Sequence, residues 1–389
     1  MKVEREYCEE ATLEHLHQIC FSKGIPFASF HEPRSERITT FIQHSKQPHI
    51  LTSLSALDSV EGFVASPFSQ TGPTYVIEPN MVHTSHKTVK EILHTLSEVT
   101  ASDGVEPLPA ESLYEATKQE FEDQVRAMQA EITKGNITKA VLSRIKLQPR
   151  RPTEEITTIF CSLADAYPDA FVYVFNIPEV GCWMGASPEP LLTVMDNVAE
   201  TISLAGTQSM DNRRMSQVTW QGKELKEQGI VTSYIEDVLN NFGITEYRKE
   251  GPSTHRAGNL VHLKTSFQFN AAQLKNRIGL LVEALQPTPS VCGLPKVAAR
   301  AIVEKVEPHN RQFYTGFVGP VNFNGKTLLY VNLRCMKITE NAFAFFMGAG
   351  ITAESIPERE WEETGQKMMT LLSVVNGINS SYELNKTGN

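Results

Sequence analysis

The sequence predicts an α+β protein in which antiparallel strands, joined by short hairpins, alternate irregularly with helices. Two turns divide stretches rich in β-branched and apolar residues: Asp196-Asn197 between residues 191–195 and 198–202, and Glu340-Asn341 between residues 328–338 and 342–347. Strands joined by hairpins pair antiparallel. The helical patterns do not follow every strand, so a doubly wound parallel sheet is not expected.

Residue spacing predicts the individual elements. One helix is predicted where four apolar residues recur at helical spacing: Phe121, Val125, Met128 and Ile132. Gly135 suits the end of that helix. Residues 171–177 are mostly β-branched or aromatic, which is typical of a strand. Two more helices are predicted at about residues 221–241 and 357–375, and Gly377 suits the end of the second.

The bulk composition excludes several classes of protein. The chain has 389 residues, of which 41% are hydrophobic and 21% charged, and its net charge is −9, so a nucleic-acid partner is not expected. No apolar run approaches the ~20 residues of a membrane helix, and the N-terminus lacks a secretory signal, so we expect a cytoplasmic protein that does not enter a membrane. The six cysteines are scattered without a C-x-x-C pair, which argues against a zinc site and a disulfide framework.

Two predicted helices each place a pair of glutamates on an apolar face. Glu224 and Glu227 share one face with Val231, and Glu360 and Glu363 begin a similar stripe on the second helix. Burying several carboxylates without a cation is prohibitive, so a divalent ion between the two helix starts is one interpretation, and hard oxygen ligands suit Mg²⁺. The other interpretation is that these glutamates lie on solvated helix faces stabilised by i,i+4 pairs. The helix pattern alone leaves both interpretations open.

Three further places could supply chemistry. Lys139 stands before a short apolar segment, where burial or nearby positive charge would let it act as a base. Glu189 follows a Ser-Pro turn and could deliver a carboxyl group to a cleft. Gly206 permits close backbone approach, and Gly348 and Gly350 invite the same interpretation, so neighbouring N–H groups could receive a carboxylate. The ordinary alternatives are that Lys139 is a solvated lysine, that Glu189 is a surface carboxylate and that the glycines lie in plain loops.

Nine segments between residues 114 and 376 together resemble the chorismate-utilising enzymes, a family of isochorismate, salicylate, anthranilate and aminodeoxychorismate synthases. In order they are TKAVLSR, GASPEPLL, SLAGT, KELKEQGIV, HLKTSF, LQPTPSVCG, FYTGFVG, YVNLRC and GAGITAESIPEREWEETGQK. Each segment is weak alone, but nine in the family's order are highly specific.

The resemblance implies a fold, a substrate and a cofactor. The fold is two antiparallel sheets packed as a sandwich, with helices outside. Residues 1–112 would be a variable segment integrated into that fold, residues 113–378 the chorismate-binding catalytic region, and residues 379–389 a polar C-terminal tail. The loop composition of residues 101–112 agrees with the first boundary. The implied substrate is the dianion chorismate, the implied cofactor is Mg²⁺, and we expect a monomer or weak homodimer.

Within the family, the residue at Lys139 distinguishes the nucleophile. Members that add water have lysine there, and members that add ammonia have glutamine. Water is a poor nucleophile that needs a general base, whereas ammonia already offers a lone pair. Lys139 therefore indicates water as the nucleophile, and no glutaminase subunit is expected. The resemblance then favours an isochorismate synthase, which adds water at ring carbon 2 with loss of the carbon 4 hydroxyl. The segment LQPTPSVCG agrees, because it resembles the PTPAVGG-type segment of isochorismate and salicylate synthases.

The resemblance also assigns roles to single residues. Those roles are Lys139 as base, Glu189 as acid, His262 beside the breaking bond, Gly206, Thr207, Arg334, Gly348, Gly350 and Lys367 as substrate-binding residues, Glu227 and Glu363 as metal ligands, and Glu224 and Glu360 as their partners. Arg334 is expected on a strand, opposite Leu329, Val331 and Leu333. Three departures from the family pattern, Gln228, Gln286 and Pro320, indicate a divergent branch and remove no catalytic or metal residue.

Three alternatives to isochorismate synthase remain. A salicylate synthase would carry out the same first step and then eliminate pyruvate, and both carry the lysine and the glutamate. An anthranilate or aminodeoxychorismate synthase is disfavoured by Lys139. A non-catalytic homologue would bind magnesium and chorismate without turnover, which the complete acid–base set disfavours. The sequence leaves open whether the product serves menaquinone, a siderophore or another route.

Overall fold

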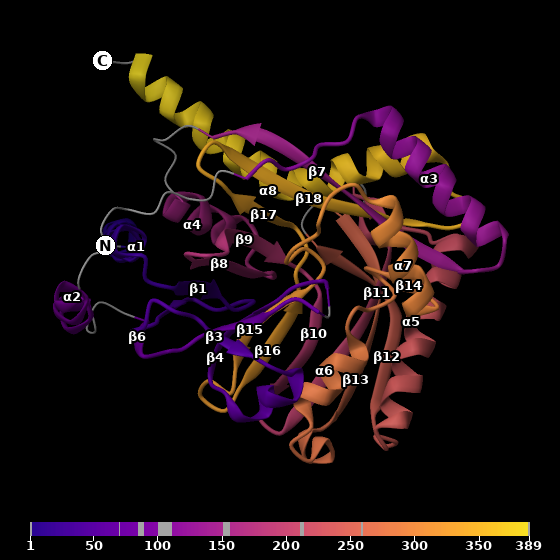
Figure 1. Ribbon diagram of the computed structural model, residues 1–389, viewed down its shortest axis with the longest axis horizontal. Helices are drawn as coiled ribbons and strands as arrows, with labels where there is room; N and C mark the ends of the chain where they lie inside the picture. The colour runs from indigo at the N-terminus through magenta and orange to yellow at the C-terminus, as the bar shows by residue number, and fades with distance from the viewer. Residues whose placement is uncertain are drawn as a thin grey trace.

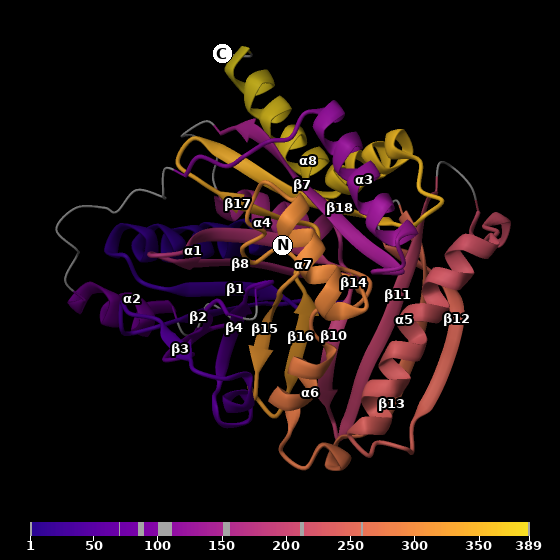
Figure 2. The same cartoon turned by 45° about the vertical axis from the view of Figure 1, so that its right-hand side comes forward.

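Two antiparallel sheets pack face to face in the computed structural model of the protein (Figure 1, Figure 2). The structure describes residues 2–69, 71–84, 89–99, 111–150, 156–210, 214–257 and 260–387. Within these ranges, each sheet contains nine strands. This is the α+β sandwich that the family resemblance implied, so the predicted fold class is confirmed.

The first sheet joins strands from distant parts of the chain. In spatial order it consists of β14 (Gly293–Leu294), β7 (Lys139–Pro149), β18 (Ala342–Ile351), β17 (Cys335–Ile338), β9 (Gly181–Ser187), β8 (Phe171–Ile177), β1 (Phe27–His31), β2 (Ile38–Ile42) and β6 (Met81–His83). The register between β1 and β8 sets Phe27 opposite Asn176. The N-terminal segment therefore extends a sheet whose other strands come from later in the chain.

The second sheet is built in the same way. In spatial order it consists of β12 (Arg248–Ala257), β13 (Leu260–Asn270), β11 (Val198–Ser209), β10 (Pro190–Met195), β16 (Thr327–Val331), β15 (Phe317–Val321), β4 (Gly62–Ser66), β5 (Thr74–Ile77) and β3 (His49–Leu51). Strand β4 pairs with β15. Residues before position 84 thus supply strands to both sheets.

Helices cover the outer faces of the two sheets. Helices α1 (Lys2–Lys23), α4 (Ile156–Ala166) and α8 (Pro357–Thr387) lie over the first sheet, and α5 (Gly222–Asn241) and α6 (Ile278–Leu285) lie over the second (Figure 2). The others are α2 (Val89–Glu98), α3 (Lys118–Thr133), α7 (Lys296–Val306) and the short 3₁₀ turns η1 (Leu54–Ser59), η3 (Met215–Gln217) and η4 (Ala271–Leu274). None of the described helices combines the length and apolar composition needed to cross a membrane.

Aromatic rings fill the space between the sheets. Strand β8 sends Phe171, Tyr173 and Phe175 inward, and its intervening valines pack under the helices, so both faces of the strand are buried. Phe171 stacks on Tyr330 of the opposite sheet with ring centroids 4.5 Å apart. A fully buried side chain of this size contributes roughly 1.5–3 kcal/mol to stability. The interior between the sheets is therefore a rigid support for the site at its end.

Several predicted elements are confirmed with their local causes. Helix α3 begins at a capping box between Thr117 and Glu120, and Gly135 follows its end with a φ of 79°, which favours glycine. The turn between β10 and β11 has φ values of 51° at Asp196 and 62° at Asn197, as a tight hairpin requires.

Two predicted boundaries are wrong. Residues 328–338 are not one strand: β16 lies in the second sheet and β17 in the first, and the chain turns between them where Arg334 has a φ of 47°. Helix α8 does not end near Gly377 but continues to Thr387, since a glycine inside a helix costs only about 1 kcal/mol. Residues 379–387 of the expected tail are consequently helical.

Candidate active site

The chain passes between the two sheets at two neighbouring points, and a cavity lies there. Strand β9 leads directly into β10, and β16 leads through residues 332–334 into β17. The two crossings are bonded to each other, because Val331 N donates to Glu189 O at 2.9 Å and Ala186 N donates to Arg334 O at 3.0 Å. Glu189 and Arg334 therefore reach the same cavity from fixed backbone positions.

Most of the residues predicted from the sequence line this cavity. They are Glu189, Gly206, Thr207, Glu224, Glu227, His262, Arg334, Gly348, Gly350, Glu363 and Lys367. Lys139 and Glu360 are not part of its wall; both are buried, with 1% and 4% of their surface exposed. Lys139 lies directly behind the wall, as its contact with Glu227 shows, whereas the structure does not bring Glu360 to the cavity.

Glu189 is a buried carboxyl group whose surroundings favour its protonated form. Burial raises its pKa to about 7, although the hydrogen bond from Ser290 and the charges of Lys139 and Arg334 lower it in part. Ser290 Oγ donates to Glu189 Oε1 at 2.8 Å. A carboxyl group with this pKa can donate a proton near neutral pH.

Lys139 is the first residue of β7, and its amine is directed at a glutamate of α5. Lys139 Nζ donates to Glu227 Oε1 at 2.6 Å. Gly350 of β18 makes room for this pair: a Cβ there would lie 3.1 Å from Glu227 Oε1 and 3.2 Å from Lys139 Cε. In this arrangement the lysine is an ion-pair donor, so acting as a base would require the pair to separate.

The second glutamate helix makes a parallel arrangement. On α8, Lys367 Nζ donates to Glu363 Oε1 at 2.6 Å and to Gly348 O at 3.0 Å. The lysine therefore lies across the end of β18 and holds Glu363 at the cavity. On α5, Glu224 Oε2 accepts a hydrogen bond from Gln221 N at 3.0 Å and closes the first turn of that helix.

The carboxylates at the cavity have the chemistry of a magnesium site without preformed ligand geometry. Glu224, Glu227 and Glu363 come from two helices to one cavity and offer hard oxygen ligands, which suit Mg²⁺. Among the described residues, however, no group of three or more His, Cys, Asp or Glu side chains is arranged as a metal site. One oxygen each of Glu227 and Glu363 is bonded to a lysine. The donor types fit the ion, and binding it would require these lysine contacts to change.

His262 of β13 is a neutral, oriented imidazole. Its Nδ1 lies 2.8 Å from Gly206 O, so this nitrogen carries the proton and donates it to the carbonyl. Burial and the nearby Arg334 charge lower its pKa to about 3. Its Nε2 is buried without a protein partner among the described residues. That nitrogen is thus an acceptor for a ligand hydroxyl group in the cavity.

Arg334 lies at the turn between the sheets instead of on the predicted strand face. Its left-handed backbone, with a φ of 47°, ends β16 and redirects the chain into β17. Its guanidinium group has no hydrogen-bond or ion-pair partner within the described part of the chain. The negative charges of Glu363 and Glu189 nevertheless favour its charged form. A half-buried guanidinium that lines a cavity without a protein partner among the described residues is suited to an anionic ligand.

Two polar side chains in the cavity wall, those of Ser290 and Tyr314, were not predicted from the sequence. Ser290 belongs to the segment LQPTPSVCG, but the match indicated nothing of its hydrogen bond to Glu189. Tyr314 lines the cavity and follows a buried arginine, Arg311. The signal that could have found Ser290 is its chemistry: a hydroxyl group in place of the family's alanine.

The departures from the family pattern occupy packing positions. Gln228 Nε2 donates to Ser203 Oγ at 2.8 Å and to Thr265 Oγ1 at 3.0 Å. Gln286 Nε2 donates to Pro67 O at 3.0 Å. Pro320 stands inside β15 opposite Phe63. Each residue is accommodated in its place, and none of them lines the cavity.

Known proteins share this sequence pattern and this fold. Residues 65–376 match the model of the family described as chorismate binding enzyme. The vibriobactin-specific isochorismate synthase of Vibrio cholerae is 28% identical over 243 residues, which are 61% of this chain and 62% of that relative, so the match spans under two thirds of it. The isochorismate synthase EntC of Escherichia coli is 27% identical over 316 residues, 80% of each chain.

A solved structure agrees with the fold. The crystal structure of the protein DhbC from Bacillus anthracis superimposes with a TM-score of 0.75 at 23% identity, covering 94% of this chain and 99% of that one. The family match covers every described strand from β5 onward in both sheets and the glutamate pairs of both helices. The chain therefore belongs to the family of chorismate binding enzymes.

Proposed function

We propose that this chain is an isochorismate synthase that converts chorismate to isochorismate, with Mg²⁺ as cofactor. Its relatives of that name support the activity. The observation that carries the proposal is a pair of groups at the cavity: a buried lysine behind its wall and a buried carboxyl group in its wall whose pKa is about 7. Together they supply the base and the acid that water addition requires.

The proton steps are assigned to this pair. Lys139, as a neutral amine, accepts a proton from water as the oxygen bonds to ring carbon 2. Glu189, in its protonated form, donates a proton to the hydroxyl group that leaves carbon 4, and the ring double bonds shift between the two carbons. One water enters and one leaves. Substrate and product differ only in the position of a hydroxyl group, so the reaction is expected to be reversible.

The remaining cavity residues hold the substrate. Arg334, whose guanidinium has no partner among the described residues, and Lys367 are assigned to the enolpyruvyl carboxylate. Gly206 and Thr207 are assigned to the ring carboxylate, and Gly348 and Gly350 leave the strand surface open at the same cavity. His262 Nε2 accepts from a ring hydroxyl group, which places the imidazole beside the bond that breaks.

The metal ligands in this proposal are Glu227 and Glu363, with Glu224 and Glu360 as partners, directly or through water. When bound, Mg²⁺ supplies Lewis-acid polarisation of the ring carboxylate. Glu360 is the least supported of the four, because it is buried away from the cavity wall. We also propose that the protein acts in the cytoplasm, as a monomer or weak homodimer, without a glutaminase partner. Lys139 supports the absence of a glutaminase partner, because it selects water over ammonia.

The direct test is to identify the product. The protein is incubated with chorismate and Mg²⁺, and the mixture is separated by chromatography. Isochorismate alone supports the proposal. Salicylate with pyruvate would reveal a salicylate synthase, and bound but unconverted chorismate would reveal a non-catalytic homologue. Repeating the incubation from isochorismate tests reversibility, since chorismate should then appear.

Replacing the acid is expected to lower turnover while leaving binding intact. Glu189→Gln keeps the shape and still accepts the Ser290 hydrogen bond, but an amide cannot donate a proton to a leaving hydroxyl group. Turnover should fall by at least about 10²-fold, with chorismate affinity little changed. Glu200→Gln, on β11 and outside the cavity wall, is the matched control. Loss of binding with normal residual turnover would make Glu189 a substrate-holding residue instead.

Removing the hydroxyl group beside the acid is expected to move the pH profile. Ser290 stabilises the charged form of Glu189, so Ser290→Ala should raise the pKa of Glu189 further above its value of about 7. The acid must be protonated to work, so activity is lost as pH rises through this pKa. The alkaline limb of kcat should therefore shift to higher pH in the variant. An unchanged limb would mean that another group governs it.

A further inference from the structure

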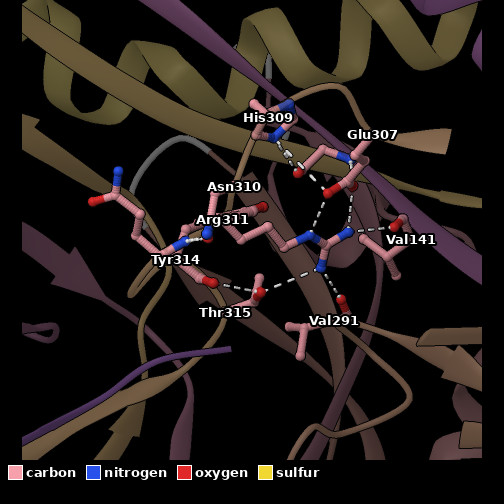
Figure 3. Close-up of polar contacts among 10 residues, drawn as sticks. Val141, Val291, Glu307, His309, Asn310, Arg311, Tyr314 and Thr315 are labelled. Atoms are coloured by element: carbon pink, nitrogen blue, oxygen red, sulfur yellow. Dashed lines mark hydrogen bonds and ion pairs between the residues drawn. The ribbon is translucent and has the colours of Figure 1, made fainter. Parts of the chain in front are cut away.

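A buried ion pair lies behind the cavity in a segment that the proposed chemistry does not use. Arg311 Nη2 donates to Glu307 Oε1 at 2.5 Å and Arg311 Nε donates to Glu307 Oε2 at 2.8 Å, which is a bidentate contact (Figure 3). Both side chains are 2% exposed. The guanidinium also stacks over the Phe68 ring, 4.5 Å from its centroid. The geometry of this arginine is therefore fixed on several sides.

The arginine also holds two backbone carbonyl groups that face each other across the end of the first sheet. Its Nη2 donates to Val141 O of β7 at 2.6 Å, and its Nη1 donates to Val291 O, in the loop before β14, at 2.9 Å. Figure 3 shows both carbonyl groups converging on one guanidinium. Nη1 further contacts Thr315 Oγ1 at 3.2 Å. One side chain thus connects a strand, a loop and the segment that leads into β15.

One carbonyl group lies close in sequence to the base, and the other lies beside the serine that bonds the acid. Val141 follows Lys139 by two residues on β7 and lines the cavity. Val291 follows Ser290, whose hydroxyl group donates to Glu189. The guanidinium consequently joins the strand that carries the base to the loop that holds the acid.

Backbone pairing alone would keep these segments folded but would not fix them as closely. Val141 N donates to Cys292 O at 2.8 Å, and Gly293 pairs with Ala140, so β7 and β14 remain attached without the arginine. The arginine adds a planar, charged clamp to that pairing. Without the arginine, the loop that contains Ser290 should therefore shift relative to β7 while the two strands stay paired.

We propose that Arg311 is a positioning residue for the reaction: by holding the Val141 and Val291 carbonyl groups it sets the distance between Lys139 and the Ser290-bound Glu189. Glu307 orients the guanidinium for this task. The proposal rests on the proposed function for its chemical meaning. Its physical content, the position of the Ser290 loop relative to β7, does not depend on which product is formed.

The first experiment uses Arg311→Lys. A lysine keeps the charge beside Glu307 but lacks the fork that reaches two carbonyl groups. We expect kcat to fall by roughly 10²-fold, as a misplacement of about 1 Å can cause, and KM for chorismate to stay within about threefold. Ser29→Ala is the matched control, because it removes a buried hydroxyl group that bonds His17 and Thr40 and lies outside the cavity wall. Its kcat should match that of the parent. An unchanged kcat in Arg311→Lys, or a fall equal to that of the control, would overturn the proposal.

A double-mutant cycle tests the route. If Arg311 acts through Ser290, then Ser290→Ala should shift the alkaline limb of kcat much less in the Arg311→Lys background than in the parent. Fully additive effects would show that the arginine does not act through this loop. If Arg311→Lys does not fold, the double replacement Glu307→Leu with Arg311→Met removes both charges together, which buried pairs often tolerate. The same fall in kcat with unchanged KM is then expected.

A readout independent of turnover separates this proposal from the proposed function. Hydrogen exchange of the backbone amides at residues 288–292 should be faster in Arg311→Lys than in the parent, and amides of β1 should be unchanged. If the parent forms no isochorismate, the proposed function fails while this comparison still decides the positioning role. Equal exchange at residues 288–292 in the two proteins would overturn it.

Discussion

Chelation of divalent ions should reduce chorismate turnover to background, and added Mg²⁺ should restore it. Glu227→Ala and Glu363→Ala should each have the same effect, because each removes a proposed carboxylate ligand from one of the two helices that meet at the cavity. The expected loss is the largest of all the changes considered. A bound cation stabilises developing charge by several kcal/mol, which corresponds to roughly 10³-fold or more in rate.

The control for these variants is Glu236→Ala. Glu236 lies on the same helix as Glu227, but it pairs with Lys249 at 2.8 Å and is outside the cavity wall. Its turnover and its dependence on Mg²⁺ should equal those of the parent. Magnesium binding is measured directly by calorimetry, so that a folded but inactive variant is distinguished from one that has lost the ion. Full activity of the parent in EDTA would refute the metal assignment.

Lys139→Gln should abolish isochorismate formation, because water then has no base. The expected loss lies at the upper end of the ~10²–10⁴-fold range for one positioned acid–base group. Some amination of chorismate could appear at high ammonium concentration, since ammonia carries its own lone pair. The measurement is a product chromatogram with and without ammonium. Near-parental formation of isochorismate would exclude Lys139 as the base.

Two features of the structure sharpen this test. Lys139 bonds Glu227, so Lys139→Gln also frees a predicted metal ligand, and Mg²⁺ affinity must be measured alongside turnover. Lys146→Gln is the matched control, because Lys146 lies on the same strand but pairs with Glu115 at the surface. A loss of turnover with unchanged magnesium affinity would assign the effect to the missing base.

Much of the fold follows from local sequence, and the failures have physical causes. The α3 cap and the Asp196-Asn197 turn were predictable because capping and tight turns depend on residues close together in the chain. The break between β16 and β17 was not predictable, since Arg334 has an uncommon left-handed backbone with no glycine or proline to mark it. Gly377 was misleading because packing of α8 on the first sheet outweighs the weak helix propensity of one glycine.

The site was predictable as a set of residues but not as an arrangement. The nine motif segments identified Glu189, His262 and both glutamate helices, because family patterns retain the chemistry of single positions. They did not reveal that Glu227 pairs with Lys139 in this state, nor that Ser290 donates to Glu189. These contacts join residues 88 and 101 positions apart in the chain, and only the packing of the two sheets determines them.

The paired crossings at β9–β10 and β16–β17 have a consequence for how such a protein can be recombined. Both sheets contain strands from the first 83 residues, and the chain changes sheet beside the cavity, so neither sheet is a contiguous module. A chimera that exchanges one sheet with that of a relative would separate Lys139, on the first sheet, from the proposed substrate-holding residues on the second. Functional exchange of segments with relatives should therefore succeed only at surface loops that leave both crossings intact.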